Sequence, residues 1–191
     1  MFVKAQRQQA RLRLALCGPS GSGKTYSALQ IARGLASDGQ IAMIDTERGS
    51  GSLYADLTEY DVAPLSPPFS PKRYIELIQA AAAAGYKVLI IDSLSHAWTG
   101  EGGVLDMHDK AAAASRNSFT AWREVTPAHN ALVDAILGAE LHVIVTLRTK
   151  TAYEVVDDSK GKKAPVKIGL APVQRDGVEY EFTVVLDLSV E

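Results

Sequence analysis

The stretch Gly18-Pro19-Ser20-Gly21-Ser22-Gly23-Lys24-Thr25 decides the fold, because it fits the pattern G-x-x-x-x-G-K-[ST]. Glycines in this pattern let the backbone curl, so that successive N–H groups point at phosphate oxygens. The lysine brings a positive charge to the β- and γ-phosphates, and the threonine hydroxyl coordinates Mg²⁺. An apolar run at 12–17 precedes the motif and a helical pattern at 24–37 follows it. This context predicts a phosphate-binding loop, and an ordinary glycine turn is the alternative. Tyr26, just after the motif, is a further candidate nucleotide contact.

Apolar runs and helical patterns alternate along the rest of the chain. Further strands are predicted at 41–44, 88–91 and 141–147. Helices are predicted at 71–84, 104–114 and 119–137, with Pro127 as a candidate break. The segments 49–70, 93–103 and 149–175 are predicted loops, and 178–190 alternates like one or two strands near a sheet edge. Strands apolar on both faces belong to parallel sheets covered by helices. The order therefore predicts an α/β domain with a largely parallel sheet sandwiched by helices.

Composition narrows the class of protein. The chain of 191 residues is predicted to form a single domain over 1–191. Its 47% hydrophobic and 22% charged residues exclude wholesale disorder. Cys17 is the sole cysteine, which excludes a disulfide scaffold. The sequence has neither an uncharged apolar run of about 18 residues nor a signal-peptide core in 1–13. A cytoplasmic protein without a membrane partner is expected.

Positive charge gathers in two segments of a chain whose net charge is −2. Residues 1–13 carry four basic side chains and no acid, and we treat 1–11 as a basic N-terminal arm. Residues 148–175 carry seven basic and three acidic side chains, a net charge of +4. The alternative interpretation of either segment is a solvated surface run.

Asp92 ends the apolar run Val88-Leu89-Ile90-Ile91, which is the Walker B pattern. Its carboxylate is expected at the carboxyl edge of the sheet beside the phosphate loop, where it can hold Mg²⁺ directly or through water. Thr25 and Asp92 are therefore the candidate metal ligands. The alternative for Asp92 is a helix cap for the segment that follows Ser93.

Glu47 is the candidate general base. It lies just past the end of the strand predicted at 41–44, and hydrolysis of ATP needs a carboxylate that orients and deprotonates water. Asp92 is assigned to the metal and is followed by Ser93 rather than by a second acid. Asp45 is the second candidate base. The alternative for Glu47 is a salt bridge to Arg48 or to another surface cation.

With these motifs together, the chain resembles the core of the RecA and Rad-type recombinases. Ile44-Asp45-Thr46-Glu47 resembles the segment that carries their catalytic glutamate, and Ile90-Ile91-Asp92-Ser93 resembles their Walker B strand. Val143-Ile144-Val145-Thr146 resembles the next strand. The segment from Thr149 and residues 177–188 occupy the places of the second DNA-binding loop and the strand after it. The small size and Ala171-Pro172-Val173-Gln174-Arg175 resemble phage-encoded RecA-like ATPases of the Sak single-strand annealing group. The resemblance covers residues 11–190.

One departure concerns the end of the 141–147 strand. RecA has an asparagine–glutamine pair where this chain has Thr146-Leu147, and that glutamine senses the γ-phosphate. Its absence argues against strand exchange of the RecA type. Arg148 or Thr146 is the candidate replacement, and we count Arg148 with Glu47 and Lys24 among the candidate catalytic residues. Two alternatives for Arg148 have equal weight, a contact to DNA and a plain surface arginine.

The resemblance implies that residues 149–176 form a flexible basic DNA-binding loop. Lysines there would contact the DNA backbone through its phosphates, and a tyrosine would stack on a base. The candidate DNA contacts are Lys150, Tyr153, Lys160, Lys162, Lys163 and Lys167. A disordered surface loop is the alternative.

Residues 94–119 are the candidate first DNA loop. It contains Trp98, for which a place in the core is favoured over an exposed stacking role. Trp122 is expected in the core as well. His108 and His142 are expected to be structural rather than metal ligands.

These inferences predict an ATPase that uses ATP and Mg²⁺ and is stimulated by DNA. The resemblance implies that it binds single-stranded DNA in phage recombination or annealing, in a bacterial host cytoplasm. It also implies a homo-oligomeric filament or ring with nucleotide at subunit interfaces, and a single-strand-binding protein as a further candidate partner. A small-molecule kinase, with Arg148, Arg116 and Arg123 as lid arginines, is one alternative. A nucleotide-gated binding module with negligible turnover is another.

Overall fold

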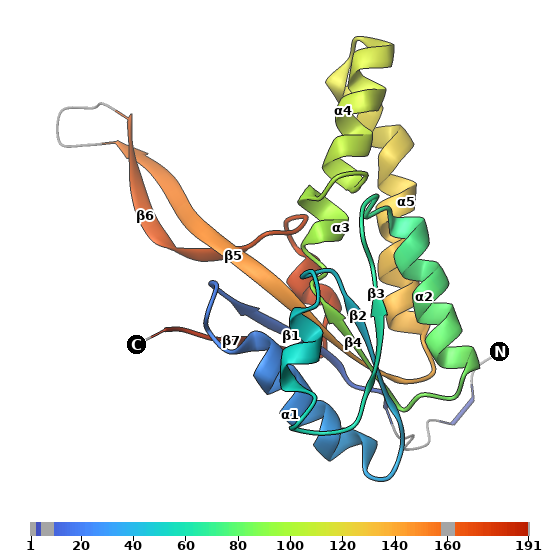
Figure 1. The fold of residues 1–191 in the computed structure, drawn as a ribbon. Coiled ribbons are helices and arrows are strands. Elements are labelled where there is room, and N and C mark those ends of the chain that lie inside the picture. Colours follow the sequence, from blue (N-terminus) through green and yellow to red (C-terminus); the bar gives the residue numbers. More distant parts are fainter. Residues whose placement is uncertain (1–2, 5–9, 158–162, 191) are drawn as a thin grey trace.

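A computed structural model describes residues 3–4, 10–157 and 163–190. Their strands form one seven-stranded sheet in the order β3-β2-β4-β5-β1-β7, with β6 paired to β5 (Figure 1). All pairings along this order are parallel, and only β5 and β6 pair antiparallel. The strands are β1 (Arg13–Gly18), β2 (Ile41–Asp45), β3 (Asp61–Pro64), β4 (Val88–Asp92), β5 (His142–Asp157), β6 (Lys163–Pro172) and β7 (Val184–Asp187). The predicted α/β class with a largely parallel sheet is confirmed.

Helices cover both faces of the sheet, as the apolar strands require. They are α1 (Lys24–Ala36), α2 (Pro71–Ala83), α3 (His96–Thr99), α4 (Val104–Ser115) and α5 (Ser118–Gly138). Buried residues of α1 such as Leu29 pack against one face, together with Leu14 and Ile90. Residues of α2 and α5 such as Ile78 and Leu132 belong to the core cluster of the other face. Every residue of β1, β2 and β4 is consequently buried.

Strand register brings the predicted site residues to one edge of the sheet. Asp45 pairs with Asp92 at the carboxyl ends of β2 and β4. Gly18 pairs with Arg148 where β1 runs beside β5. In open parallel sheets, ligands bind at this carboxyl edge.

The segment 149–175 is not the loop that the sequence predicts. β5 continues to Asp157 and pairs with β6 from Thr149↔Pro172 to Asp157↔Lys163. Figure 1 shows this hairpin projecting beyond the sheet. In Figure 1 no helix covers the described part of this hairpin that projects from the sheet, so the apolar run of a buried strand is not required there. Lys160 and Lys162 lie outside the described residues, as do the side chains of Tyr153, Lys163 and Lys167.

Two further expectations are wrong. The loop predicted at 49–70 contains a 3₁₀ helix, η1 (Ser50–Tyr54), and the edge strand β3. β3 is short and ends at Pro64, which an edge strand tolerates because one side of it needs no N–H donor. The loop predicted at 93–103 contains the short helix α3. Because α4 and the start of α5 follow, the candidate first DNA loop at 94–119 is mostly helical.

Pro127 does not break α5, which runs unbroken for 21 residues. The side chain of Asn117 caps its start by accepting hydrogen bonds from the N–H groups of Phe119 and Thr120. The alternating segment 178–190 holds a short 3₁₀ helix, η2 (Val178–Glu181), and then the edge strand β7. In the described part of the chain, no helix has the length and hydropathy of a membrane span.

Arg13 belongs to β1, as the predicted strand at 12–17 requires, and is buried with 6% of its surface exposed, so the alternative of a solvated run does not hold for this residue. Its guanidinium donates hydrogen bonds to the carbonyl groups of Leu137, Ala139 and Leu141, where α5 ends and β5 begins. The carbonyl groups of Leu137 and Ala139 lie at the end of α5, where intrahelical donors are missing. His142 has a structural role, since its Nδ1 accepts a hydrogen bond of 2.9 Å from the N–H of Leu12.

Candidate nucleotide site

The phosphate-binding loop connects β1 to α1. Gly21 and Gly23 have φ angles of 79° and 81°, which L side chains rarely adopt, so the loop requires glycine at both positions. The side chain of Lys24 folds back over the loop, and its Nζ donates to the carbonyl groups of Gly18 (2.9 Å) and Pro19 (2.7 Å). Burial lowers the pKa of Lys24, while the charges of Asp92 and Glu47 oppose that shift.

No side chain caps the start of α1, because Gly23 occupies the N-cap position. The first N–H groups of this helix therefore remain available to an anion, and the helix dipole favours negative charge there. A phosphate placed here would meet these N–H groups together with the ammonium group of Lys24.

Asp92 lies at the end of β4 with 2% of its surface exposed. The Thr25 hydroxyl donates to one of its oxygens at 2.6 Å, and the Thr146 hydroxyl donates to the other. Burial raises the pKa of Asp92, and the two hydroxyl groups counteract part of that rise. The two candidate metal ligands, Thr25 and Asp92, are thus in direct contact. The hydroxyl of Thr146, a candidate γ-phosphate sensor, is hydrogen-bonded to Asp92 in this structure.

Glu47 and Arg148 face each other beside the loop. Arg148 donates to both carboxylate oxygens of Glu47, with 3.0 Å between Nε and Oε1. This is the two-pronged geometry that makes arginine–carboxylate pairs strong. Burial raises the pKa of Glu47, but the hydrogen bonds and charge of Arg148 outweigh it and hold the pKa below its ordinary value. The salt bridge considered from the sequence therefore exists, although its cation is Arg148 rather than Arg48.

Asp45, the second candidate base, has a different task. Its carboxylate accepts hydrogen bonds from the N–H groups of Glu47 (2.7 Å), Gly49 (2.9 Å) and Gly51 (3.2 Å). These bonds hold the backbone turn that carries Glu47. Asp45 is not among the residues that line the cavity described next.

A cavity of about 570 Å³ brings these groups together. Its lining residues are Ser20, Gly21, Gly23, Lys24, Thr25, Glu47, Ser50, Tyr54, Asp92, Arg148 and Thr149. Ser50, Tyr54 and Thr149 were missed from the sequence, and the local signal was that they lie close along the chain to Glu47 or to Arg148. Tyr26 is exposed and does not line the cavity. Its ring packs edge to face against that of Tyr54, with 6.3 Å between the ring centroids.

A buried network fixes the backbone behind the site. The Thr46 hydroxyl accepts a hydrogen bond of 2.7 Å from the N–H of Ser93 and lies 2.7 Å from Nδ1 of His96. The Ser95 hydroxyl accepts the N–H of Arg148 at 2.9 Å. Burial and the charge of Arg148 lower the pKa of His96, so its imidazole is neutral near pH 7. These bonds tie together the end of β4 with Asp92, the turn after β2 that precedes Glu47, and the part of β5 that carries Arg148.

The donor set suits Mg²⁺. A hydroxyl and a carboxylate are the hard oxygen ligands that Mg²⁺ takes beside substrate phosphates. Thr25 and Asp92 supply both, already in contact. The residues that the structure describes contain no cluster of three His, Cys, Asp or Glu that could hold a metal by itself.

Trp98, Trp122 and His108 form a stack outside the lining of this cavity. The rings of Trp98 and Trp122 stack with 5.9 Å between their centroids, and the ring of His108 stacks on Trp122 with 4.2 Å between centroids. His108 is buried and its Nε2 lies 3.1 Å from the carbonyl oxygen of Ser118. Both tryptophans are only partly buried, and their packing joins α3, α4 and α5.

The parallel sheet, the phosphate-binding loop and the acid at the end of β4 define a P-loop nucleotide-binding domain of the ATPase kind. A family model described as an AAA domain matches residues 10–191, nearly the whole chain. The chain therefore belongs to this AAA domain family. Domains of this class generally use ATP with Mg²⁺. A comparison with curated proteins gives no match.

Proposed function

We propose that this domain is a DNA-dependent ATPase of the RecA-like type that binds Mg²⁺-ATP and single-stranded DNA. The observation that carries the proposal is the course of β5. β5 carries Thr146, which is hydrogen-bonded to Asp92, and Arg148, which is hydrogen-bonded to Glu47. The same strand then continues through Lys150 into the hairpin. A ligand held along the hairpin and a nucleotide held at the sheet edge would thus act on the same strand.

The nucleotide cavity supports the first half of this function. Lys24 would exchange its two carbonyl partners for phosphate oxygens, and Thr25 with Asp92 would hold Mg²⁺. When bound, Mg²⁺ neutralises charge that develops on the phosphates. Glu47 would orient and deprotonate water, and Arg148 would place its positive charge beside the γ-phosphate. Both side chains line the cavity, Glu47 from the turn after β2 and Arg148 from β5.

The charge of the hairpin supports the second half. The segment 148–175 has a net charge of +4 in a chain whose net charge is −2. Single-stranded nucleic acid binds to such positive surfaces through its phosphates. Together with the resemblance to Sak-type phage ATPases, this favours a role in recombination or single-strand annealing. On the same resemblance we propose a filament or ring with nucleotide at subunit interfaces, and a single-strand-binding protein as a partner.

The test is the rate of ATP hydrolysis with and without single-stranded DNA, in the presence of Mg²⁺. We expect DNA to raise the rate, and we expect Lys24→Ala to remove hydrolysis under both conditions. Hydrolysis that does not respond to DNA would refute the DNA-dependent function while leaving the ATPase assignment intact.

Of the three arginines proposed as lid residues in the kinase alternative, Arg148 lines the nucleotide cavity, where it is paired with Glu47. Arg123 lines a groove on the outer side of α5, and Arg116 lies at the end of α4. Neither lines the nucleotide cavity, where a lid arginine would have to close over the phosphates.

A further inference from the structure

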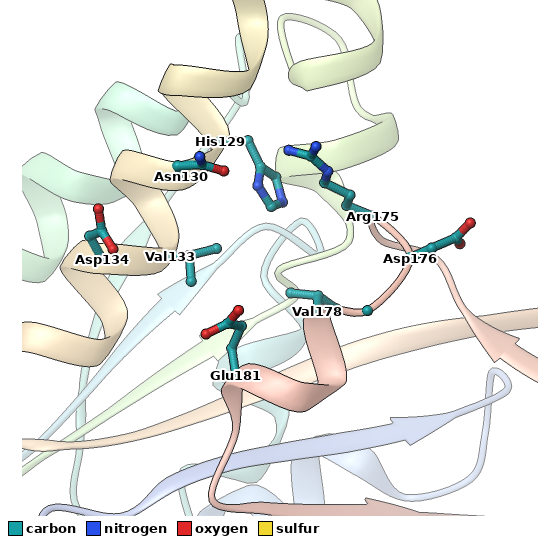
Figure 2. Close-up of a pocket in the computed structure, with 9 residues that line it drawn as sticks. His129, Asn130, Val133, Asp134, Arg175, Asp176, Val178 and Glu181 are labelled. Atoms are coloured by element: carbon teal, nitrogen blue, oxygen red, sulfur yellow. The ribbon is translucent and has the colours of Figure 1, made fainter. Parts of the chain in front are cut away.

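A second cavity, of about 370 Å³, lies between α5 and the segment that follows β6 (Figure 2). α5 contributes His129 and Val133, and the later segment contributes Arg175, Val178 and Glu181. Its volume falls in the range of small-ligand pockets, which is roughly 300–1,000 Å³. The described residues that line it all differ from those of the nucleotide cavity. Neither the proposed hydrolysis of ATP nor the proposed DNA contacts of the hairpin involve it.

His129 is the most buried polar side chain of this cavity. Only 6% of its surface is exposed, and its Nδ1 has no hydrogen-bond partner among the described residues. Figure 2 shows the imidazole ring pointing into the space between α5 and η2. Trp98 packs edge to face against this ring, with 5.6 Å between the centroids. Buried polar atoms are nearly always hydrogen-bonded, so the unpartnered Nδ1 points to a ligand of this cavity.

Arg175 brings a positive charge to the same place. Figure 2 draws its guanidinium beside the imidazole ring of His129. Within the described part of the chain, Arg175 forms no salt bridge. Burial and the charge of Arg175 lower the pKa of His129, so the imidazole is neutral near pH 7. A neutral imidazole can carry its proton on Nδ1 and donate from there. A charged donor and a neutral donor then face one space.

Both donors are held in place by contacts outside the cavity. The buried side chain of Gln174 donates a hydrogen bond of 3.2 Å to the carbonyl group of Leu94 and accepts the N–H of Arg175 at 2.9 Å. This fixes the backbone that carries Arg175, while Trp98 holds the ring of His129 from the side of α3. A site whose groups are already ordered loses little entropy when a ligand binds.

The acids of the lining decide which anion fits. Figure 2 draws the carboxylates of Asp134 and Asp176 pointing away from the cavity, while the side chain of Glu181 extends from η2 towards α5. All three acids are exposed and lie around the cavity rather than on its two donors. Electrostatic repulsion grows with the charge of the ligand, so these acids disfavour a phosphate dianion more than a single carboxylate.

We propose that this cavity binds a carboxylate on a short aliphatic body between Arg175 and His129. The guanidinium would donate to both carboxylate oxygens, and Nδ1 of His129 would add a further hydrogen bond. Val133 and Val178 would pack against the aliphatic body. Glu181 would reject a second negative charge and favour a positive group at the far end of the ligand. Such a carboxylate belongs either to a free amino acid or to an acidic side chain of a partner polypeptide.

The experiment is an NMR titration of the full chain, without nucleotide or DNA, that follows the imidazole ¹⁵N resonances of His129. Propionate presents the carboxylate alone, γ-aminobutyrate adds an ammonium group at the far end, and N-acetyl-aspartic acid methylamide presents the acid as a polypeptide would. We expect all three to bind, with Nδ1 protonated in the complex, and propylamine not to bind. Tightest binding of γ-aminobutyrate would identify a free amino acid as the ligand, and tightest binding of the blocked aspartate would identify an acidic side chain of a partner.

A matched pair of variants makes the test specific. Arg175→Gln should weaken propionate about tenfold or more, because the carboxylate loses its charge-assisted hydrogen bonds. The control Arg123→Gln removes an exposed arginine of α5 that does not line this cavity, and it should bind as the unaltered chain does. Absence of binding by all three carboxylates, equal affinity of the two variants, tighter binding of inorganic phosphate than of propionate, or an unprotonated Nδ1 in the complex would overturn the proposal. Since the titration needs neither nucleotide nor DNA, its outcome is independent of the proposed function.

Discussion

Replacing Glu47 with glutamine should leave ATP binding intact and slow hydrolysis by about 10²-fold or more, the usual contribution of a general base. Glutamine keeps the shape of the side chain, and its oxygen can still accept from Nε of Arg148, which lies 3.0 Å from Oε1 in the unaltered protein. It cannot accept a proton from water at neutral pH. The perturbation therefore removes the proposed chemistry while preserving the geometry.

The cost in folding stability should be small. The side chains of Glu47 and Arg148 are 24% and 48% exposed, and solvent screens ion pairs at such positions. Losing the charge of this pair should change the free energy of unfolding by about 1 kcal/mol or less. A large loss of hydrolysis in Glu47→Gln can then be assigned to chemistry rather than to unfolding.

The assay combines ATP affinity, measured by calorimetry with Mg²⁺, and single-turnover hydrolysis. Glu124→Gln, an exposed acid on α5, is the matched control and should retain the normal rate. Hydrolysis at the unaltered rate in Glu47→Gln would refute the role of Glu47 and require a base from elsewhere, such as a neighbouring subunit.

The pH dependence of hydrolysis offers an independent check on the same pair. A base must be deprotonated to act, and the hydrogen bonds and charge of Arg148 hold the pKa of Glu47 below its ordinary value. In Arg148→Gln the largest of the interactions that lower the pKa of Glu47 are lost, so this pKa should rise. The acid limb of the hydrolysis rate should then move to higher pH. An acid limb at the same pH in both proteins would contradict the assignment.

Three further predictions concern the phosphate loop, the hairpin and the core. Lys24→Ala should reduce hydrolysis to background with an unchanged circular dichroism spectrum, and normal turnover would contradict the active-site assignment. Alanine substitution of three hairpin lysines should weaken the salt dependence of binding to single-stranded DNA. The slope of log affinity against log salt concentration should become shallower by about 2, at about 0.7 per lost phosphate contact. Equal slopes in the variant and the unaltered protein would exclude these lysines as DNA contacts. The three lysines are Lys160, Lys162 and Lys163. Arg13→Met should lower the free energy of unfolding in urea by about 2–4 kcal/mol, because three carbonyl groups lose their donor. Arg11→Met, at an exposed position, should cost about 0.5 kcal/mol or less, and equal stability of the two variants would contradict the role of Arg13.

The sequence was sufficient for features that depend on neighbours along the chain. The glycine pattern ending at Lys24 predicts a loop because glycine alone adopts positive φ freely at positions such as Gly21 and Gly23. The apolar run that ends at Asp92 predicts a buried strand with an acid at its tip, and β4 has that form. Since parallel strands end at one edge, the α/β class followed from these local patterns.

Tertiary structure alone decided which side chains meet. Glu47 and Arg148 are 101 residues apart in sequence, and they pair because β2, β4 and β5 lie next to one another. Arg13 was counted both in the basic segment 1–13 and in the predicted strand 12–17, and the fold of β1 against the end of α5 decided that it is buried. The hairpin of β5 and β6 escaped prediction because much of it pairs beyond the helices that would impose an apolar pattern. The cavity around His129 likewise forms where α5 meets a segment more than 40 residues later in the chain. Local propensity acts over a few residues, whereas these contacts arise from the packing of distant segments.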